Sequence, residues 1–338
     1  MLVKFGITLE PTMPHEEVIS LSKMADASRI EHVWICDTSP SPPFGDVFVT
    51  LAALAVNTKN VKLGSSICNP YTRNPALIAA ATLSLDSLSK GRAILGLGSG
   101  SIDRLTSLGI SQRNPVDTVK DAVNACRKLF NGEIVSVKSP GFQLQDIVLT
   151  QAGHNIPIYL GGSGPKMLGL AGELADGVLL TCSSDYLPTA IGYVQKGADK
   201  LGRDVDELDI TNSLVISLSE DEIEAKGAAR EIVLDLVAWG RPEALAASGI
   251  KRQEQDALRI AIDKKGPEAA VDLVTDKMVD ALSASGPIEK CFVKCQDQIK
   301  KGVGHLIFCL PFGPDPEEAV QRICKELVPK LREKQGKA

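Results

Sequence analysis

Short apolar runs alternate with amphipathic segments along the first hundred residues. The runs begin near positions 4, 32, 61 and 92, so the unit recurs every 28 to 31 residues. Between them, helical patterns with apolar positions on one face span 14–28, 46–58 and 75–88. This repeat has the length of a strand, a loop, a helix and a return. Asn74-Pro75 agrees, because Asn is a good N-cap and Pro a good first helical residue.

The alternation continues less regularly through the rest of the chain. Helices are expected over 114–131, 165–174 and 316–334, and a β-hairpin over 134–148 with Pro140-Gly141 at its turn. Further short strands begin near positions 156, 177, 208 and 304. Eight strands that are nearly all followed by helices predict an α/β protein with a (β/α)8 TIM barrel.

The chain has no clear linker, so we interpret 1–338 as a single barrel domain. Residues 219–301 are helix-rich without an obvious strand, and we expect them to form an insertion. A doubly wound dinucleotide fold is disfavoured, because the glycine cluster Gly96 to Ser101 follows the fourth strand and lacks the third glycine of G-x-G-x-x-G.

Composition narrows the classes of function. With 44% hydrophobic and 23% charged residues the chain is typical of a globular protein. A net charge of -5 and only 4% aromatic residues argue against nucleic-acid binding. No apolar run is long enough to span a membrane, and the first residues do not resemble a signal peptide. The eight cysteines are scattered without metal-ligand spacing, which predicts reduced thiols, no metal site and a cytoplasmic location.

In a barrel of this kind the active site lies at the carboxyl ends of the strands. The residues expected there are rich in Gly, Ser and Thr and poor in His and paired carboxylates. Such a rim suits a large ligand held by backbone amides and hydroxyls, with a cofactor supplying the chemistry. The segments that this rule selects are Thr8 and Glu10, Cys36 to Thr38, Ser65 to Asn69, Gly98 to Ser101, Gly161 to Lys166 and Thr181 to Ser184.

The segment Gly161 to Lys166 has two interpretations. Its glycines permit close backbone approach, the next helix directs amides outward, and Lys166 adds positive charge, which together favour a phosphate site. An ordinary tight turn between strand and helix gives the same pattern. The glycines from Gly96 to Gly100 have the same two interpretations.

Two carboxylates stand near the expected mouth. Glu10 lies two residues beyond Thr8 and so on the same side of the first strand, where it is either a general acid or a solvated loop residue. Asp37 ends a buried strand and either accepts a hydrogen bond from a ligand or caps the following loop.

The segment VKLGSSICNPYTRNPALIAAATLSLDSLSKGRAILGLGSGS resembles the luciferase-like superfamily of flavin- and deazaflavin-dependent oxidoreductases. Its specific block joins Asn69-Pro70-Tyr71-Thr72-Arg73 to a helix, Gly91-Arg92, a strand and Gly-x-Gly-x-Gly. With IPIYLGGSGPKMLGLAGELADGVLL and VTDKMVDALSASGPIEKC, the chain is most similar to the methylenetetrahydromethanopterin reductases, which use coenzyme F420. The similarity runs from Val3 to the final helix.

The resemblance implies that a deazaflavin lies across the barrel mouth. It implies a non-prolyl cis peptide at Ser66-Ile67 that bulges against the ring, and a phosphate region at Gly161 to Gly164. The residues then expected to bind the cofactor are Asp37, Thr38, Ser66, Ile67, Asn69, Gly98, Ser99, Gly100, Gly161, Gly162, Ser163 and Gly164.

The chain departs from the family at its usual acids. Methanopterin reductases carry an acidic residue at the position of Thr8 and an Asp at that of Ser101. Other F420 enzymes of the superfamily carry His at the position of Thr38 and Glu at that of Ser101. Thr8 and Ser101 therefore mark catalytic positions without their acids, and we expect Glu10, one strand period beyond Thr8, to substitute.

Three functions remain open from the sequence. The first is an F420-dependent reductase that transfers hydride between the deazaflavin and the methylene carbon of a tetrahydropterin, of methanopterin or folate type. The second is an enzyme with FMN and oxygen chemistry, and the third a cofactor-binding paralogue without turnover. The long helical insertion and the low aromatic content also suggest a homodimer or homotetramer.

Overall fold

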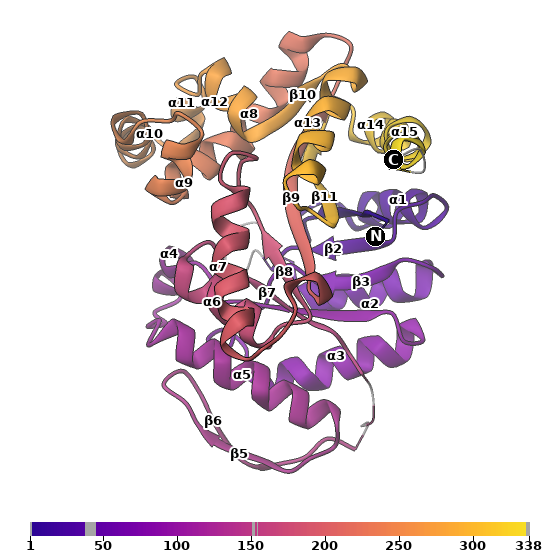
Figure 1. The fold of residues 1–338 in the computed structure, drawn as a ribbon, viewed down its shortest axis with the longest axis vertical. Helices are drawn as coiled ribbons and strands as arrows, with labels where there is room; N and C mark the ends of the chain where they lie inside the picture. Colours follow the sequence, from indigo (N-terminus) through magenta and orange to yellow (C-terminus); the bar gives the residue numbers. More distant parts are fainter. Residues whose placement is uncertain (1, 38–44, 151–152, 154, 336–338) are drawn as a thin grey trace.

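The computed structural model describes residues 2–37, 45–150, 153 and 155–335. Within them, eight parallel strands run in the order β9-β11-β1-β2-β3-β4-β7-β8, and β8 pairs back with β9. The sheet is therefore closed, which confirms the predicted (β/α)8 TIM barrel (Figure 1). The barrel strands are β1 (Lys4–Leu9), β2 (His32–Ile35), β3 (Lys62–Ser65), β4 (Ala93–Leu97), β7 (Ile158–Gly161), β8 (Gly177–Leu180), β9 (Asp209–Leu218) and β11 (His305–Phe312).

Helices cover the outside of the barrel, and local capping fixes where several begin. Asp46 accepts hydrogen bonds from the Phe48 and Val49 amides, and Asn74 accepts one from the Ala76 amide, as its sequence predicted. The covering helices are α1 (His15–Asp26), α2 (Val47–Asn57), α3 (Pro75–Ser89), α4 (Ile102–Ser107), α5 (Pro115–Phe130), α6 (Pro165–Leu174), α7 (Leu187–Lys200), α14 (Pro316–Arg322) and α15 (Val328–Gln335).

The 219–301 segment contains mostly helices, but also one strand that the sequence analysis missed. The strand β10 (Ser283–Gly286) pairs in parallel with the outer half of β9. Its sequence SASG carries no large apolar residue, so it gave no strand signal. That this chain is one domain stays a prediction. The helices of the segment, at the top of Figure 1, are α8 (Glu222–Trp239), α9 (Pro242–Ala247), α10 (Arg252–Lys265), α11 (Pro267–Val271), α12 (Asp276–Leu282) and α13 (Ile288–Lys300).

Two smaller elements complete the described chain. The predicted hairpin is present as β5 (Val135–Lys138) and β6 (Gln143–Ile147), with Pro140-Gly141 between the strands. The expected final helix is interrupted, because a π-helical turn at Ile323–Leu327 separates α14 from α15. A short 3-10 turn, Val205–Glu207, precedes β9. In the described residues, no helix combines the length and apolarity needed to cross a bilayer.

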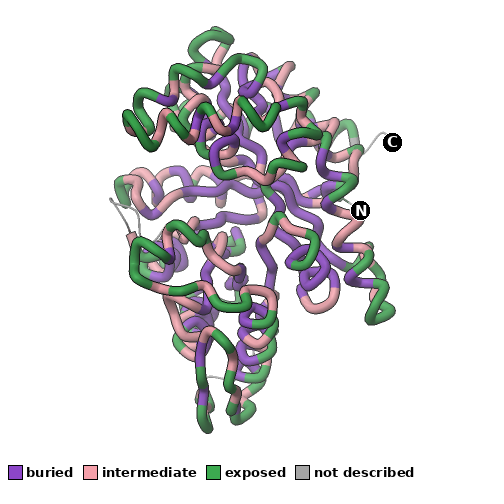
Figure 2. Tube along the Cα trace, turned by 90° about the vertical axis from the view of Figure 1, so that its left-hand side faces the viewer, coloured by how far each residue is buried: buried purple, intermediate pink, exposed green. Residues whose placement is uncertain are grey.

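The barrel interior is packed at its amino-terminal floor. Glycines on the strands leave room for large rings from their neighbours: a Cβ at Gly64 would collide with Trp34, and one at Gly177 with Tyr159. These two rings lie 5.4 Å apart between centroids and are buried. The strands are accordingly buried along the middle of the molecule (Figure 2). Among the described residues, the lining of the cavity at the opposite end of the barrel includes no aromatic ring.

Candidate functional site

A cavity of about 870 Å³ occupies the carboxyl ends of the barrel strands. Its walls come from the tips of β1, β2, β3, β4, β7 and β8, from the starts of α4, α5 and α6, and from one residue of the insertion, Arg241. Cavities of this size hold ligands larger than a single ring. The residues predicted from sequence that line it are Glu10, Asp37, Ser66, Ile67, Asn69, Ser99, Gly100, Ser101, Gly161, Gly162, Ser163 and Gly164.

Two predicted residues do not line the cavity, and a third lies outside the described residues. Thr8 is buried one strand period below Glu10 and is not part of the cavity wall. Gly98 lies behind Ile67, where a Cβ would collide with the isoleucine side chain. Thr38 lies outside the described residues. This relative depth is consistent with the expectation that Glu10 supplies the acid that is missing at the position of Thr8.

The wall beside β3 is formed by the predicted cis peptide bond. The Ser66-Ile67 bond is cis, and the Ile67 side chain lies against both Gly98 and Gly161. A Cβ on Gly161 would come within 2.9 Å of the Ile67 methyl group. The absence of a Cβ at Gly98 and Gly161 therefore makes room for the Ile67 side chain, and Ile67 and Gly161 contribute an apolar part of the cavity wall.

The glycine loop after β4 is held from two sides. Gly100 has φ +70°, a backbone conformation that glycine adopts without strain, and a Cβ there would lie 3.1 Å from the Asn69 side chain. The Asn69 amide oxygen accepts hydrogen bonds from the Tyr71 and Thr72 amides, at 3.1 and 2.9 Å. Gln112 donates from its side-chain amide to the carbonyl oxygens of Ser99 and Gly100. These bonds fix the backbone of the loop against the cavity.

The far end of the cavity is positively charged. The helix α6 begins at Pro165. Its N-cap residue, Gly164, has no side chain that could accept hydrogen bonds from the first amides of the helix. Lys166, in the first turn of this helix, lines the same part of the cavity, and Arg104 also lines the cavity. The Arg241 guanidinium approaches Gly164, with Nη1 3.1 Å from the position of a Cβ there. Helix amides and guanidinium groups both favour phosphate.

Arg241 also contains a buried donor. Its Nε atom is buried and has no hydrogen-bond partner among the described residues, while Nη2 lies 3.5 Å from Glu243. Buried N–H groups without partners are uncommon in folded proteins. This orphaned donor beside the start of α6 is consistent with an anionic ligand at that point.

The near end of the cavity has one carboxylate that is suited to proton transfer. Glu10 lines the wall, and its Oε2 accepts a hydrogen bond from the Thr12 hydroxyl at 3.2 Å. The neighbouring thiol of Cys36 is not a candidate nucleophile, because burial and then the charge of Glu10 raise its pKa well above the ordinary range. The cavity therefore offers an acid at one end and cations at the other.

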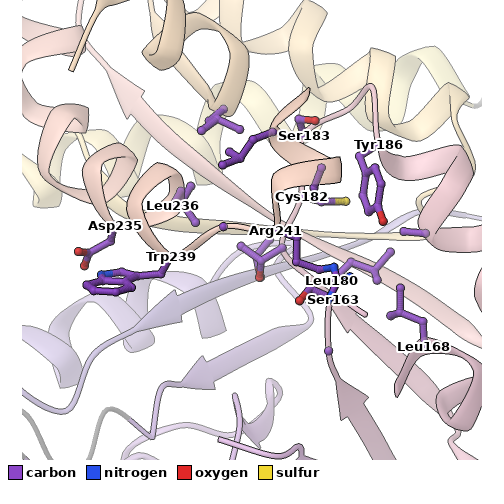
Figure 3. A pocket seen from close by; sticks show the side chains of 18 residues that line it. Ser163, Leu168, Leu180, Cys182, Ser183, Tyr186, Asp235, Leu236, Trp239 and Arg241 are labelled. Atoms are coloured by element: carbon purple, nitrogen blue, oxygen red, sulfur yellow. The ribbon is translucent and has the colours of Figure 1, made fainter. Parts of the chain in front are cut away.

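A smaller cavity of about 280 Å³ opens beside the first (Figure 3). It lies between the tip of β8, the middle of β9 and the helices α6 to α9, and its walls are mostly apolar. Gly162, Ser163, Thr181 and Arg241 line both cavities, so the two adjoin at these residues. The sequence analysis did not foresee this space.

The arrangement fits a flat ring joined to a phosphate. The apolar surface of Ile67 and its flanking glycines would accept a ring face, the hydroxyls and amides of Ser99 to Ser101 a polyol chain, and the cationic end a phosphate. No three His, Cys, Asp or Glu side chains of the described chain lie where they would hold a metal ion. The site thus supplies positions for a bound redox group and one acid to accompany it.

Sequence reasoning missed two residues of this site. Arg241 comes from the insertion, 77 positions after Gly164, and only the fold of α8 and α9 brings it to the cavity. Gln112 lies in an irregular loop and acts on backbone atoms, so no side-chain motif announced it. The only sequence signal for Arg241 was its place directly before Pro242, and a residue followed by proline is also an ordinary start of a helix.

Comparison with known proteins gives consistent relatives. The profile of the family described as luciferase-like monooxygenase matches residues 2–305. The 5,10-methylenetetrahydromethanopterin reductase of Methanolobus tindarius is 36% identical over 327 residues, covering 96% of this chain and 99% of that protein. The reductase of the same name from Archaeoglobus fulgidus is 34% identical over 336 residues, covering 98% and 100%.

The fold is also that of a solved structure. The coenzyme F420 dependent tetrahydromethanopterin reductase from Methanopyrus kandleri superposes with a TM-score of 0.90 at 28% identity, covering 98% of this chain and 100% of that one. The similarity therefore extends through the insertion and is not limited to the barrel strands.

Proposed function

The chain belongs to the luciferase-like monooxygenase family, and from this premise we propose that it is an oxidoreductase that uses coenzyme F420. Its substrate is a tetrahydropterin, and the reaction interconverts the methylene and methyl levels of the bound carbon. The observation that carries the proposal is the cavity, in which the apolar wall at Ile67, with glycines beside it, leads to a cationic end. The full-length similarity to methylenetetrahydromethanopterin reductases supports the choice of substrate class.

Different residues of the chain would bind different parts of the cofactor. Ile67, with Gly98 and Gly161 behind it, would face the deazaflavin ring. The backbone from Ser99 to Ser101 would face the ribityl chain, and Gly162 to Lys166 with Arg241 the phosphate. When bound, the deazaflavin supplies hydride transfer at C5. The protein contributes orientation of two bound reactants and exclusion of water, and such positioning accounts for much of the rate in reactions of this kind.

Glu10 is the proposed acid. The methylene carbon of the substrate bridges two nitrogens, and opening the bridge leaves one nitrogen in need of a proton. Glu10 stands at the mouth, where its carboxylate accepts a hydrogen bond from the Thr12 hydroxyl, and it lies one strand period beyond Thr8, the position without an acid. Ser101 lines the cavity and presents only a hydroxyl there. The proton transfer is therefore assigned to Glu10 alone.

The proposal is tested by binding and by turnover. Titration with F420 and, separately, with FMN would be followed by the change in cofactor fluorescence. Reduced F420 would then be supplied with methylene-tetrahydromethanopterin or with methylene-tetrahydrofolate, and its oxidation followed by absorbance. We expect saturable F420 binding and oxidation with one of the two pterins. Binding of FMN with no binding of F420 would overturn the cofactor, and F420 binding without turnover of either pterin would overturn the reaction.

We also propose that the chain forms a homodimer or homotetramer. The outer faces of α2 and α3 expose Val49, Val56, Leu77 and Leu88, each more than half exposed. These two neighbouring helices carry a single charged residue, Asp86, and it is buried. An uncharged apolar face of this extent is typical of an interface. Light scattering on Val49→Glu beside the unmodified protein tests this: dissociation to monomer is expected, and an unchanged mass would contradict it.

A further inference from the structure

The smaller cavity beside the cofactor site is enclosed by apolar side chains. Leu168, Leu180, Leu236, Leu245 and Leu282 contribute to its walls, together with Ala190 and Ala244. Figure 3 shows Trp239 and Asp235 at one edge and the ring of Tyr186 at the opposite side. The charged residues of its wall are Asp235 and Arg241, and Arg241 is one of the residues shared with the larger cavity.

Several polar groups of the wall, at Cys182 and Ser183, already have partners. Ser183 accepts a hydrogen bond from the Ser248 hydroxyl at 2.6 Å. The Cys182 amide donates to the side chain of Asn212 at 3.1 Å, and Asn212 donates back to the Cys182 carbonyl oxygen. Burial raises the pKa of the Cys182 thiol to about 12, so it is neutral near pH 7. Because most of the wall is apolar, a charged or strongly polar occupant would lose hydration that the few polar side chains replace only in part.

The volume selects the size of the occupant. An apolar cavity of about 150 Å³ holds a benzene molecule. The cavity of about 280 Å³ accordingly has room for one substituted aromatic ring, and it is too small for the tricyclic ring of a deazaflavin with its side chain. The larger cavity, at about 870 Å³, takes the cofactor and the reacting end of the substrate.

The smaller cavity also lies where part of the substrate must extend. In a methylene-tetrahydropterin, the reacting carbon is bonded to the nitrogen of an arylamine, so the aryl ring stands one bond beyond the reacting group. A substrate whose reacting carbon lies in the larger cavity must place that ring in an adjoining space. Thr181 and Ser213 bring the smaller cavity to the barrel mouth, and the insertion helix α8 closes it from above.

We propose that this cavity is a substrate subsite for the arylamine ring, an assignment that rests on the proposed function. Leu236 and Leu245 of the insertion face one side of the ring, and Leu168 and Leu180 of the barrel wall the other. The Tyr186 ring borders the space (Figure 3). The insertion thereby sets which ring substituents are accepted, while the barrel tips hold the cofactor.

The test fills the cavity with a larger side chain. Ala244→Phe on α9 and Ala190→Leu on α7 both place atoms in the space from opposite walls. Ala247→Phe is the matched control, because Ala247 is exposed on the same helix α9. The probe is 4-trifluoromethylaniline, observed by ¹⁹F NMR. We expect its affinity to fall at least tenfold in both cavity-filling variants and to be unchanged in the control, with F420 affinity unchanged in all three.

Turnover separates this proposal from the one on which it rests. With a methylene-tetrahydropterin that the unmodified enzyme accepts, Ala244→Phe is expected to raise KM at least tenfold and to leave kcat within about twofold. Unchanged probe binding, or unchanged KM, in both cavity-filling variants overturns the subsite and leaves the proposed function intact. Failure of the unmodified enzyme to oxidise reduced F420 with any pterin overturns the proposed function, while lost probe binding still supports an aryl site.

Discussion

The two ends of the barrel are built from the same strands but differ in what occupies the interior. At the floor, Trp34 and Tyr159 fill the space that Gly64 and Gly177 leave. Asp209 accepts hydrogen bonds there from Lys4 and Tyr159, at 3.0 and 2.6 Å. At the mouth, glycines flank the cavity and Arg241 has a buried donor without a partner among the described residues.

The contrast indicates where this sequence places stability and where it places function. The floor's polar groups on Lys4, Tyr159 and His305 share Asp209 as a partner, so they hold strands together. Those of the mouth are aimed into an open cavity, so they are available to a ligand. Substitutions at the floor are expected to change the free energy of unfolding, and substitutions at the mouth to change binding or rate.

The largest effect is expected at the floor from Asp209→Ala. Removing this carboxylate leaves Lys4, Tyr159 and His305 without their common acceptor, and His305 Nδ1 lies 3.2 Å from it. Lys4 is partly exposed, so the cost comes mainly from the buried groups that lose their acceptor, at about 1–3 kcal/mol for each group. Urea unfolding should show a loss of this size, with the F420 affinity of the folded fraction unchanged. A decrease in the free energy of unfolding of less than about 1 kcal/mol would mean that the contacts of Asp209 do not stabilise the barrel.

At the mouth, Glu10→Gln sharpens the contrast in the opposite direction. Loss of a general acid reduces kcat about a hundredfold or more. Stability and F420 affinity should stay near those of the unmodified enzyme, because Glu10 bonds only the nearby Thr12 hydroxyl among the described side chains. Single-turnover oxidation of reduced F420 measures the effect, with Glu16→Gln, at an exposed carboxylate on α1, as the control. A rate like that of the unmodified enzyme would remove Glu10 from the reaction.

Arg241→Ala addresses the cationic end of the cavity. A charge-assisted hydrogen bond contributes about 1.5–3 kcal/mol, so the dissociation constant of F420 should rise at least tenfold. Arg241→Lys should recover part of the affinity, and Arg252→Ala, an exposed arginine of the same insertion, should have no effect. Fluorescence titration gives the three constants. Equal F420 affinity in the unmodified protein and in the three variants would contradict a phosphate beside Arg241.

Much of this contrast was visible in the sequence, and the reason is local. The recurrence of apolar runs and the Asn74-Pro75 cap depend on nearby residues, and they predicted the barrel. The period of two along a strand placed Glu10 above Thr8, and the glycines near 98 and 161 marked the mouth. The small residues of β10 gave no such pattern, because its pairing with β9 decides its conformation.

The unforeseen parts depend on contacts between distant segments. Arg241 reaches Gly164 only after the insertion has folded over the barrel. The smaller cavity is enclosed by α6 to α9 and two strands, and no one of these segments contains a signal for it. The pairing of Asp209 with His305 spans 96 positions, and neither residue stands in a motif. Packing creates these features after the local elements are set.

The smallest expected effect is a pH dependence of stability that comes from the floor. Burial, followed by the nearby His305, holds the pKa of His32 well below its ordinary value of 6.5. The unfolded chain therefore binds a proton that the folded chain refuses, so stability is full above pH 6.5 and falls as the pH is lowered below it. The slope is at most about 1.4 kcal/mol per pH unit for one proton.

Thermal unfolding between pH 7.5 and 5 tests this slope. His32→Gln should flatten the curve, whereas His15→Gln, at an exposed position on α1, should leave it unchanged. Equal slopes in the unmodified protein and in His32→Gln would show that the histidine at the floor does not resist protonation.

The most direct measurement is a crystal structure of the chain with F420. The account predicts the deazaflavin ring against Ser66-Ile67 and the phosphate at the start of α6 beside Arg241, with the smaller cavity left open next to the ring. Cofactor bound elsewhere on the molecule, or a phosphate directed away from Gly162 to Lys166, would contradict the division between a structural floor and a cofactor-binding mouth.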